Sequence, residues 1–107
     1  MPYIIVYIRY PSDLATEVQE KYFEIMKELP FDKSLGKETI PVASNSNVNG
    51  IEIISVMEVK QGKLEEALKW ARKRMRGFQS IKGLEYDMRL WNTLAEALEG
   101  SGYSPPQ

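Results

Sequence analysis

Hydrophobic and polar residues follow the same order twice along the chain: a strand pattern, a long amphipathic helix pattern and a second strand pattern. The first copy covers residues 3–44 and the second covers residues 51–91. Residues 3–9 are β-branched or aromatic almost throughout, and residues 84–91 alternate with a period of two. This order predicts an α+β fold, a βαββαβ sandwich in which helices cover one face of an antiparallel sheet.

Each predicted helix has one apolar side, which is expected to face the sheet. The apolar positions are Leu14, Val18, Tyr22, Ile25, Met26 and Leu29 in the first helix, and Leu64, Ala67, Leu68, Ala71, Met75 and Phe78 in the second. Ser12 or Asp13 is expected to cap the first helix, and Pro30 to end it. Thr93 and Glu96 have the spacing of a capping box and predict a short final helix.

Pro41 indicates that the strand over residues 38–44 lies at an edge of the sheet, because proline cannot donate a hydrogen bond to a neighbouring strand. Residues 45–50 are rich in asparagine and are expected to connect two strands, with Asn49 and Gly50 in the hairpin turn. We expect one domain over residues 1–99. Residues 100–107, with two prolines and two glycines, are expected to form a flexible C-terminal tail.

Composition narrows the chemistry that the chain can perform. The 107 residues include 14 basic and 15 acidic side chains, so the net charge of −1 creates no overall attraction for nucleic acid or an acidic membrane. There is no cysteine and no histidine, which excludes disulfides, thiolate or imidazole metal ligands and a Ser-His-Asp triad. We therefore expect no metal and no cofactor. The N-terminus lacks the features of a signal peptide, so a cytoplasmic location is expected.

A family resemblance rests on two segments. Residues 58–67 read EVKQGKLEEA and residues 81–86 read IKGLEY. Together they resemble the strand, helix start and final strand of the dimeric α/β-barrel superfamily, a group of ferredoxin-like domains that includes antibiotic-biosynthesis monooxygenases. The resemblance implies that two protomers pack their open sheet faces together around a central cavity. Haem-degrading members rely on a histidine, which this chain lacks, so the resemblance does not imply that activity.

The sheet face without helices is the first candidate site, because it must be covered by water or by a partner. Strand alternation is expected to place there the candidate ligand-binding residues Tyr7, Arg9, Glu58, Asp87, Arg89 and Trp91. Arginines could hold a carboxylate, tyrosine could donate a hydrogen bond, and Glu58 or Asp87 could accept a proton. If the first strand has the opposite phase, the residues on this face are instead Ile4, Val6, Ile8 and Tyr10.

This open face allows three interpretations. We expect a homodimer that holds a small organic ligand between the two sheets. In one alternative, Arg9 and Arg89 only pair with acidic neighbours at the dimer interface. In another, the cavity belongs to a cofactor-free monooxygenase-like or isomerase-like enzyme that removes a proton from its substrate.

Nucleic-acid or protein docking is a further alternative, because charge is distributed unevenly along the chain. Residues 1–59 contain five basic and nine acidic side chains, whereas residues 60–91 contain nine and four. Within the second helix, the candidates for phosphate contacts are Lys69, Arg72, Lys73, Arg74 and Arg76. A solvated helix surface explains the same residues, and the chain has no aromatic signature of an RNA-recognition motif.

Overall fold

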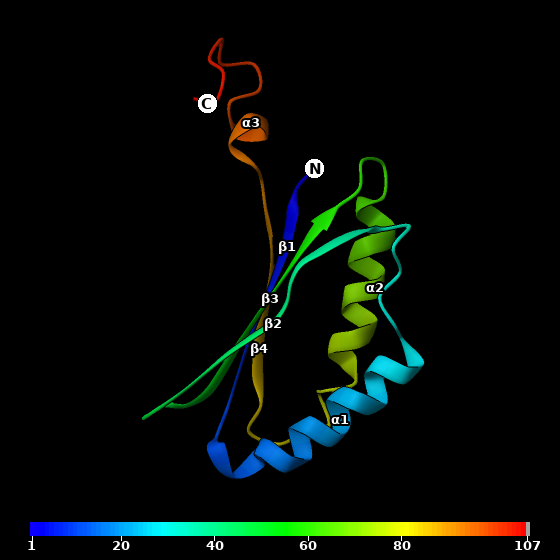
Figure 1. Cartoon of the computed structure of the whole chain (residues 1–107), viewed down its shortest axis with the longest axis vertical. Helices are drawn as coiled ribbons and strands as arrows, with labels where there is room; N and C mark the ends of the chain where they lie inside the picture. Colours follow the sequence, from blue (N-terminus) through cyan, green and yellow to red (C-terminus); the bar gives the residue numbers. More distant parts are fainter. Residues whose placement is uncertain (107) are drawn as a thin grey trace.

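A four-stranded antiparallel sheet with strand order β2-β3-β1-β4 organises the computed structural model, which describes residues 1–106. The strands are β1 (Tyr3–Tyr10), β2 (Gly36–Asn47), β3 (Gly50–Val59) and β4 (Glu85–Trp91). The helices are η1, a 3-10 turn (Ser12–Leu14), α1 (Ala15–Glu28), α2 (Leu64–Arg76) and α3 (Leu94–Ala97). Figure 1 shows α1 and α2 on the same side of the sheet. The predicted α+β class is therefore confirmed.

The pairing of β1 determines which residues face the helices. Ile8 lies opposite Ile53 of β3, whereas Tyr7 lies opposite Ile54. Ile8 is 7% exposed and belongs to the core, while Tyr7 is 38% exposed on the other face. The phase that places Tyr7 on the open face is therefore correct, and the reversed phase is wrong.

The core lies between the sheet and the helices in two clusters, and both predicted helix stripes contribute to it. One cluster contains Ile8, Tyr10, Val18, Ile25, Met75, Phe78 and Ile81. The other contains Ile4, Leu35, Met57, Val59, Ala67 and Ala71. The first cluster joins the sheet to α1 and the end of α2, and the second joins it to the start of α2. Packing on both helices thus depends on the inward positions of β1.

The β2 strand is at an edge of the sheet, as Pro41 predicted, but it is longer than expected. It continues to Asn47, which pairs with Gly50, so the loop contains Val48 and Asn49 rather than Asn49 and Gly50. A Cβ on Gly50 would lie 2.4 Å from the backbone oxygen of Tyr10, and its φ is +113°. Glycine is favoured here by both space and backbone conformation.

The start of α1 differs from the prediction, whereas the start of α3 agrees with it. Neither Ser12 nor Asp13 caps α1; both lie in the 3-10 turn before it, and no side chain makes a capping hydrogen bond. At α3, the Glu96 amide donates to Thr93 Oγ1 at 3.2 Å, and the Thr93 amide donates to Glu96 Oε1 at 2.8 Å. The predicted capping box is therefore confirmed.

Candidate functional site: a cavity between the helices and the sheet

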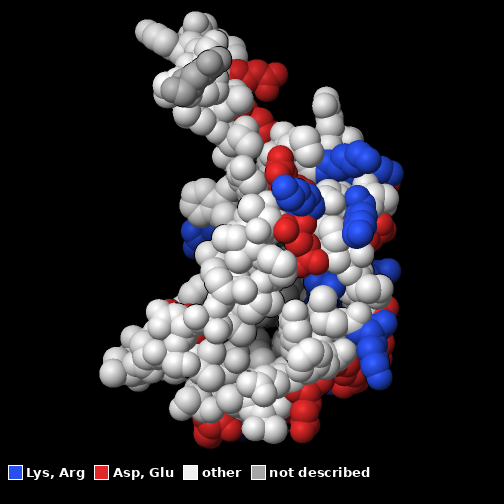
Figure 2. Space-filling model, in the orientation of Figure 1, with Lys and Arg blue, Asp and Glu red and all other residues white. Residues whose placement is uncertain are grey.

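A cavity of about 610 Å³ lies between the helices and the inner face of the sheet. The space-filling view shows it as a hollow between the strands and the helices (Figure 2). Its lining consists mainly of aliphatic and aromatic side chains, contributed by β1, β2, β3, α1 and α2. The volume falls within the range of small-molecule sites, roughly 300–1,000 Å³.

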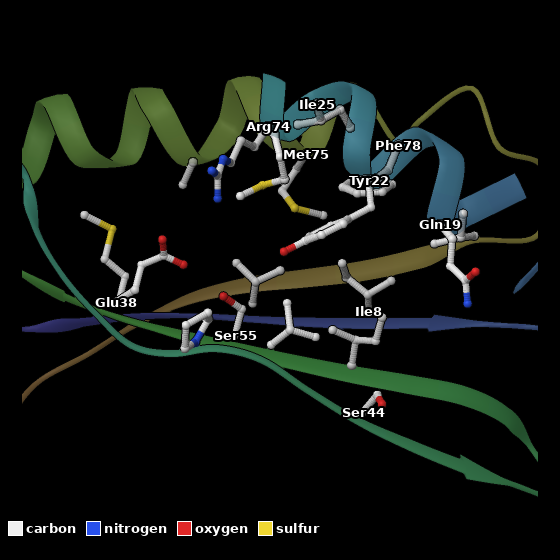
Figure 3. A pocket seen from close by; sticks show the side chains of 18 of the residues that line it. Ile8, Gln19, Tyr22, Ile25, Glu38, Ser44, Ser55, Arg74, Met75 and Phe78 are labelled. Atoms are coloured by element: carbon white, nitrogen blue, oxygen red, sulfur yellow. The ribbon is translucent and has the colours of Figure 1, made fainter. Parts of the chain in front are cut away.

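The walls of the cavity follow from the patterns that form the core. Alternation in β3 directs Ile51, Ile53 and Ser55 toward the helices, and the apolar side of α1 contributes Val18 and Tyr22. Figure 3 shows Tyr22 from α1 and Ser55 from β3 on opposite walls. The side chains thus give an apolar surface with a hydroxyl on each side.

The β2 strand lines the open side of the cavity. Its pairing with β3 shifts between Glu38 and Ile40 and again between Ile40 and Ala43. Pro41 and Val42 lie in the second irregular segment and line the cavity, and Val42 is 44% exposed. Because the inner side of β2 is exposed here, the cavity remains open along this edge.

Arg74 of α2 lies where α1 ends. Its Nε donates a hydrogen bond to the backbone oxygen of Leu29 at 2.8 Å, and its guanidinium carbon lies 4.1 Å from the ring centroid of Trp70. The Trp70 Nε1 donates to the oxygen of Pro30 at 3.3 Å. A cation at a helix C-terminus is favoured by the helix dipole. These contacts hold the guanidinium in one orientation.

The other side of the same guanidinium is not satisfied by the protein. Among residues 1–106, Arg74 Nη2 is buried and has no hydrogen-bond partner. Burial lowers the pKa of Arg74, and the negative charge of Glu38 acts in the opposite direction. Figure 3 shows Arg74 and Glu38 extending into the cavity from the helix side and the β2 side. They are the one cation and the one carboxylate that line it in the described chain.

The six residues predicted as ligand-binding candidates are not in this cavity. Tyr7, Arg9, Glu58, Asp87, Arg89 and Trp91 all lie on the opposite, open face. They are spread along the whole length of this face. Near one end of β1, Arg9 lies between Glu52 and Glu85 of the neighbouring strands. At the other end, Tyr3 lies between Glu58 and Trp91. The structure brings them to one face but not into one pocket.

Hydrogen bonds within the chain occupy most of the polar groups on the open face. Arg9 Nη2 donates to Glu85 at 2.7 Å, and Arg89 Nε donates to Asp87 at 2.8 Å. These pairs agree with the alternative in which Arg9 and Arg89 form ion pairs with acidic neighbours. The Tyr7 hydroxyl donates to Glu52, which raises the pKa of Tyr7 and lowers the pKa of Glu52.

The basic residues of α2 other than Arg74 face solvent. Figure 2 shows blue basic side chains along the α2 side of the molecule, with acidic side chains among them. Lys69, Arg72, Lys73 and Arg76 are exposed. Lys69 lies 3.9 Å from Glu65, one turn earlier in the helix. Arg74 therefore differs from the basic residues with which the sequence grouped it.

Comparisons with known proteins give the fold but no family. No protein-family profile matches the chain, and no curated protein sequence matches it. A de novo designed protein, Foldit4, is similar in structure, with a TM-score of 0.57 and 12% identity over 86% of this chain and 97% of that one. A formyltetrahydrofolate deformylase from Pseudomonas putida KT2440 has a TM-score of 0.45 and 10% identity over 83% of this chain, which spans 28% of that protein. The similarity to the designed protein supports the α+β fold alone.

Neither a membrane-spanning helix nor a metal-binding cluster occurs in the part of the chain that the structure describes. Within residues 1–106, no helix is both long and apolar enough to cross a bilayer. The same part of the chain contains no cluster of three or more acidic residues placed to hold a metal ion.

Proposed function

We propose that this protein binds a small, largely apolar organic molecule in the cavity between the helices and the sheet. The observation that carries the proposal is the size and lining of this cavity, about 610 Å³ with mainly aliphatic and aromatic walls. Burying apolar ligand surface there is favourable by roughly 25 cal/mol per Å². The few polar groups at its walls, among them Tyr22, Ser55 and Arg74, can orient a ligand.

This proposal keeps the small-ligand function expected from the sequence but assigns it to a different cavity. The sequence predicts a site between the two sheets of a dimer, whereas the proposed site lies within one protomer. Ile8 and Ile53, which are paired across β1 and β3, line it from the sheet side. A single protomer is therefore sufficient for binding.

Filling the cavity tests the proposal. Ser55→Leu adds apolar volume to the inner side of β3, and Ser80→Leu makes the same change at an exposed position outside the lining. A neutral apolar dye such as Nile red should bind the wild type and Ser80→Leu equally, and bind Ser55→Leu at least about tenfold more weakly. Methyl NMR should place the dye against Ile8 and Ile53. Equal binding to all three proteins, or no binding to the wild type, would contradict the proposal.

We also propose that the chain is a ferredoxin-like domain that forms a dimeric α/β barrel through its open sheet face. The strand order β2-β3-β1-β4 and the placement of both long helices on one side support this. The open face carries exposed apolar residues, including Ile40, Ile54 and Trp91, which are 39%, 40% and 50% exposed. The ion pairs Arg9–Glu85 and Arg89–Asp87 neutralise four of the charges on this face, which reduces the repulsion between two copies, while Glu52 and Glu58 lie on the same face outside these pairs.

Sedimentation tests the assembly. The wild type at micromolar concentration should sediment at about twice the chain mass of 12.3 kDa. Trp91→Glu should shift the protein toward monomer, because it places a charge in an apolar contact. Tyr103→Glu makes the same type of change at a residue that is 79% exposed and should leave the dimer intact. A wild-type monomer at high concentration would exclude this assembly.

A further inference from the structure

We infer that the ligand of the cavity is a monocarboxylic acid with an apolar body, and that its carboxylate binds the Arg74 guanidinium. This inference rests on the cavity binding proposed above and specifies the chemical class of the ligand. Among residues 1–106, Arg74 is the one cation that lines the cavity.

The contacts of Arg74 fix its guanidinium before any ligand binds. Rotation of the side chain toward bulk water would break the hydrogen bond from Nε to Leu29 and the stacking on Trp70. Phe31 packs edge-on against Trp70, with ring centroids 5.4 Å apart, so the indole is held as well. An arginine that is already ordered loses little entropy when it binds an anion.

The unpaired nitrogen indicates the kind of group that the site can bind. Nη2 is buried and has no acceptor among the described residues, whereas Nε is already used. The edge formed by the two terminal nitrogens therefore remains for a ligand, and this edge matches the two oxygens of a carboxylate. Nη2 has almost no exposed surface, so a ligand oxygen reaches it only when nearby side chains adjust, as interface side chains commonly do on binding.

Glu38 limits the charge of the ligand. It lines the cavity from β2, and its charge already affects the pKa of Arg74, although no carboxylate oxygen of residues 1–106 lies within 4.0 Å of the guanidinium. A ligand carboxylate on Arg74 is attracted by one charge and repelled more weakly by the other. A second negative charge on the ligand would have no cation to bind, which favours a monoanion.

The remaining lining selects the body of the ligand. Beyond Arg74 and Glu38, the cavity is bounded mainly by side chains such as Tyr22, Ile53 and Phe78. These surfaces accept an aliphatic chain or an aromatic ring but offer few partners for further polar groups. A medium-chain fatty acid or an aryl carboxylic acid has this combination of one charged end and one apolar body.

Decanoate and methyl decanoate, used below micelle-forming concentrations, distinguish binding of the carboxylate by Arg74 from binding of the apolar chain by the cavity walls. Binding is followed by calorimetry and by tryptophan fluorescence, to which Trp70 beside Arg74 and Trp91 on the open face both contribute. The wild type should bind decanoate about 10- to 100-fold more tightly than the ester, the range expected for hydrogen bonds to a charged group. Arg74→Met should remove this preference while ester binding persists. Arg72→Met, at an exposed position of the same helix, should leave the preference unchanged.

Glu38→Gln distinguishes an anionic ligand from a neutral one. If a carboxylate binds Arg74, removing the Glu38 charge should strengthen decanoate binding several-fold. If a neutral polar group bridges Arg74 and Glu38, the same change should weaken binding, and the inference is overturned. It is also overturned if acid and ester bind the wild type equally, a comparison that needs no variant. Absence of binding by both probes would instead contradict the cavity proposal itself.

Discussion

Arg74→Met should destabilise the protein only moderately, by about 1 kcal/mol, although Arg74 makes several contacts at the end of α1. The substitution removes a hydrogen bond from a charged donor to Leu29, worth about 1.5–3 kcal/mol, and a cation–π contact with Trp70, worth about 0.5–2 kcal/mol. It also removes a half-buried charged group whose buried Nη2 lacks a partner in the described chain. Leaving such a group unsatisfied costs about 1–3 kcal/mol.

Methionine keeps part of the packing that the arginine stem provides. Its thioether can remain against the Trp70 ring, a contact worth about 0.3–1.5 kcal/mol. Taken together, these opposing contributions predict a loss of about 1 kcal/mol in the free energy of unfolding. If the partnerless Nη2 cost nothing in the wild type, the loss should be larger, about 3 kcal/mol or above, because only the lost hydrogen bond and the lost cation–π contact would count.

Urea unfolding followed by far-UV circular dichroism measures this difference directly. The matched control is Arg72→Met, which alters an exposed arginine of the same helix and should change the unfolding free energy by less than about 0.5 kcal/mol. A loss above about 3 kcal/mol for Arg74→Met, with an unchanged denaturant dependence, would show that Arg74 is mainly structural. Its unpaired nitrogen would then have no role in binding a ligand.

Three further predictions concern the fold around the two faces. Gly77→Ala should destabilise the protein by about 1 kcal/mol in chemical unfolding. The added Cβ would lie 2.5 Å from Ile25 Cδ1, and this overpacking outweighs the higher helix preference of alanine. Combining it with Ile25→Val, which removes the Cδ1 atom, should reduce the destabilisation. In the folded protein, the pKa of Glu52 lies below its ordinary value of 4.5. The ionised Glu52 therefore stabilises the fold above pH 4.5, and this stabilisation is lost as the pH falls through the folded pKa. Glu52→Gln should flatten the acid side of a stability–pH profile. Thr93→Ala should cost about 1 kcal/mol of local stability in α3, seen as faster amide exchange at Glu96, and an unchanged exchange rate would contradict the capping role.

Regular patterns predicted the elements well because apolar residues recur at the spacing of a strand or helix, even in β4, where Tyr86 and Leu90 are 38% and 45% exposed. The alternation over residues 84–91 became β4, and the apolar positions of the second helix lie in or against the core. The sequence predicts a shorter β2, over residues 38–44, because the asparagines near the end of the strand have low strand preference. Asn45 and Asn47 nevertheless extend the strand because they pair with β3, a contact that local preference does not reveal.

The cavity could not be predicted from these patterns, because periodicity states which side of a helix is apolar but not how closely that side approaches the sheet. Tyr22 has the spacing of an ordinary core residue, yet it lines the cavity. Arg74 carried a weak signal, its position four residues after Trp70 at the border of the apolar stripe. Its charge placed it with the exposed basic residues of α2. Only the packing of α1 against α2 distinguishes it from them.

The two proposals can be tested separately because a strand sends adjacent residues to opposite faces. On β3, Ile54 lies on the open face, while Ser55 lines the cavity on the other side. A change at Ser55 should therefore alter ligand binding without changing the sedimenting mass, and a change at Trp91 should do the reverse. If Trp91→Glu both dissociates a dimer and abolishes binding, the cavity must depend on the partner protomer. The ligand site would then belong to the assembly rather than to the single chain.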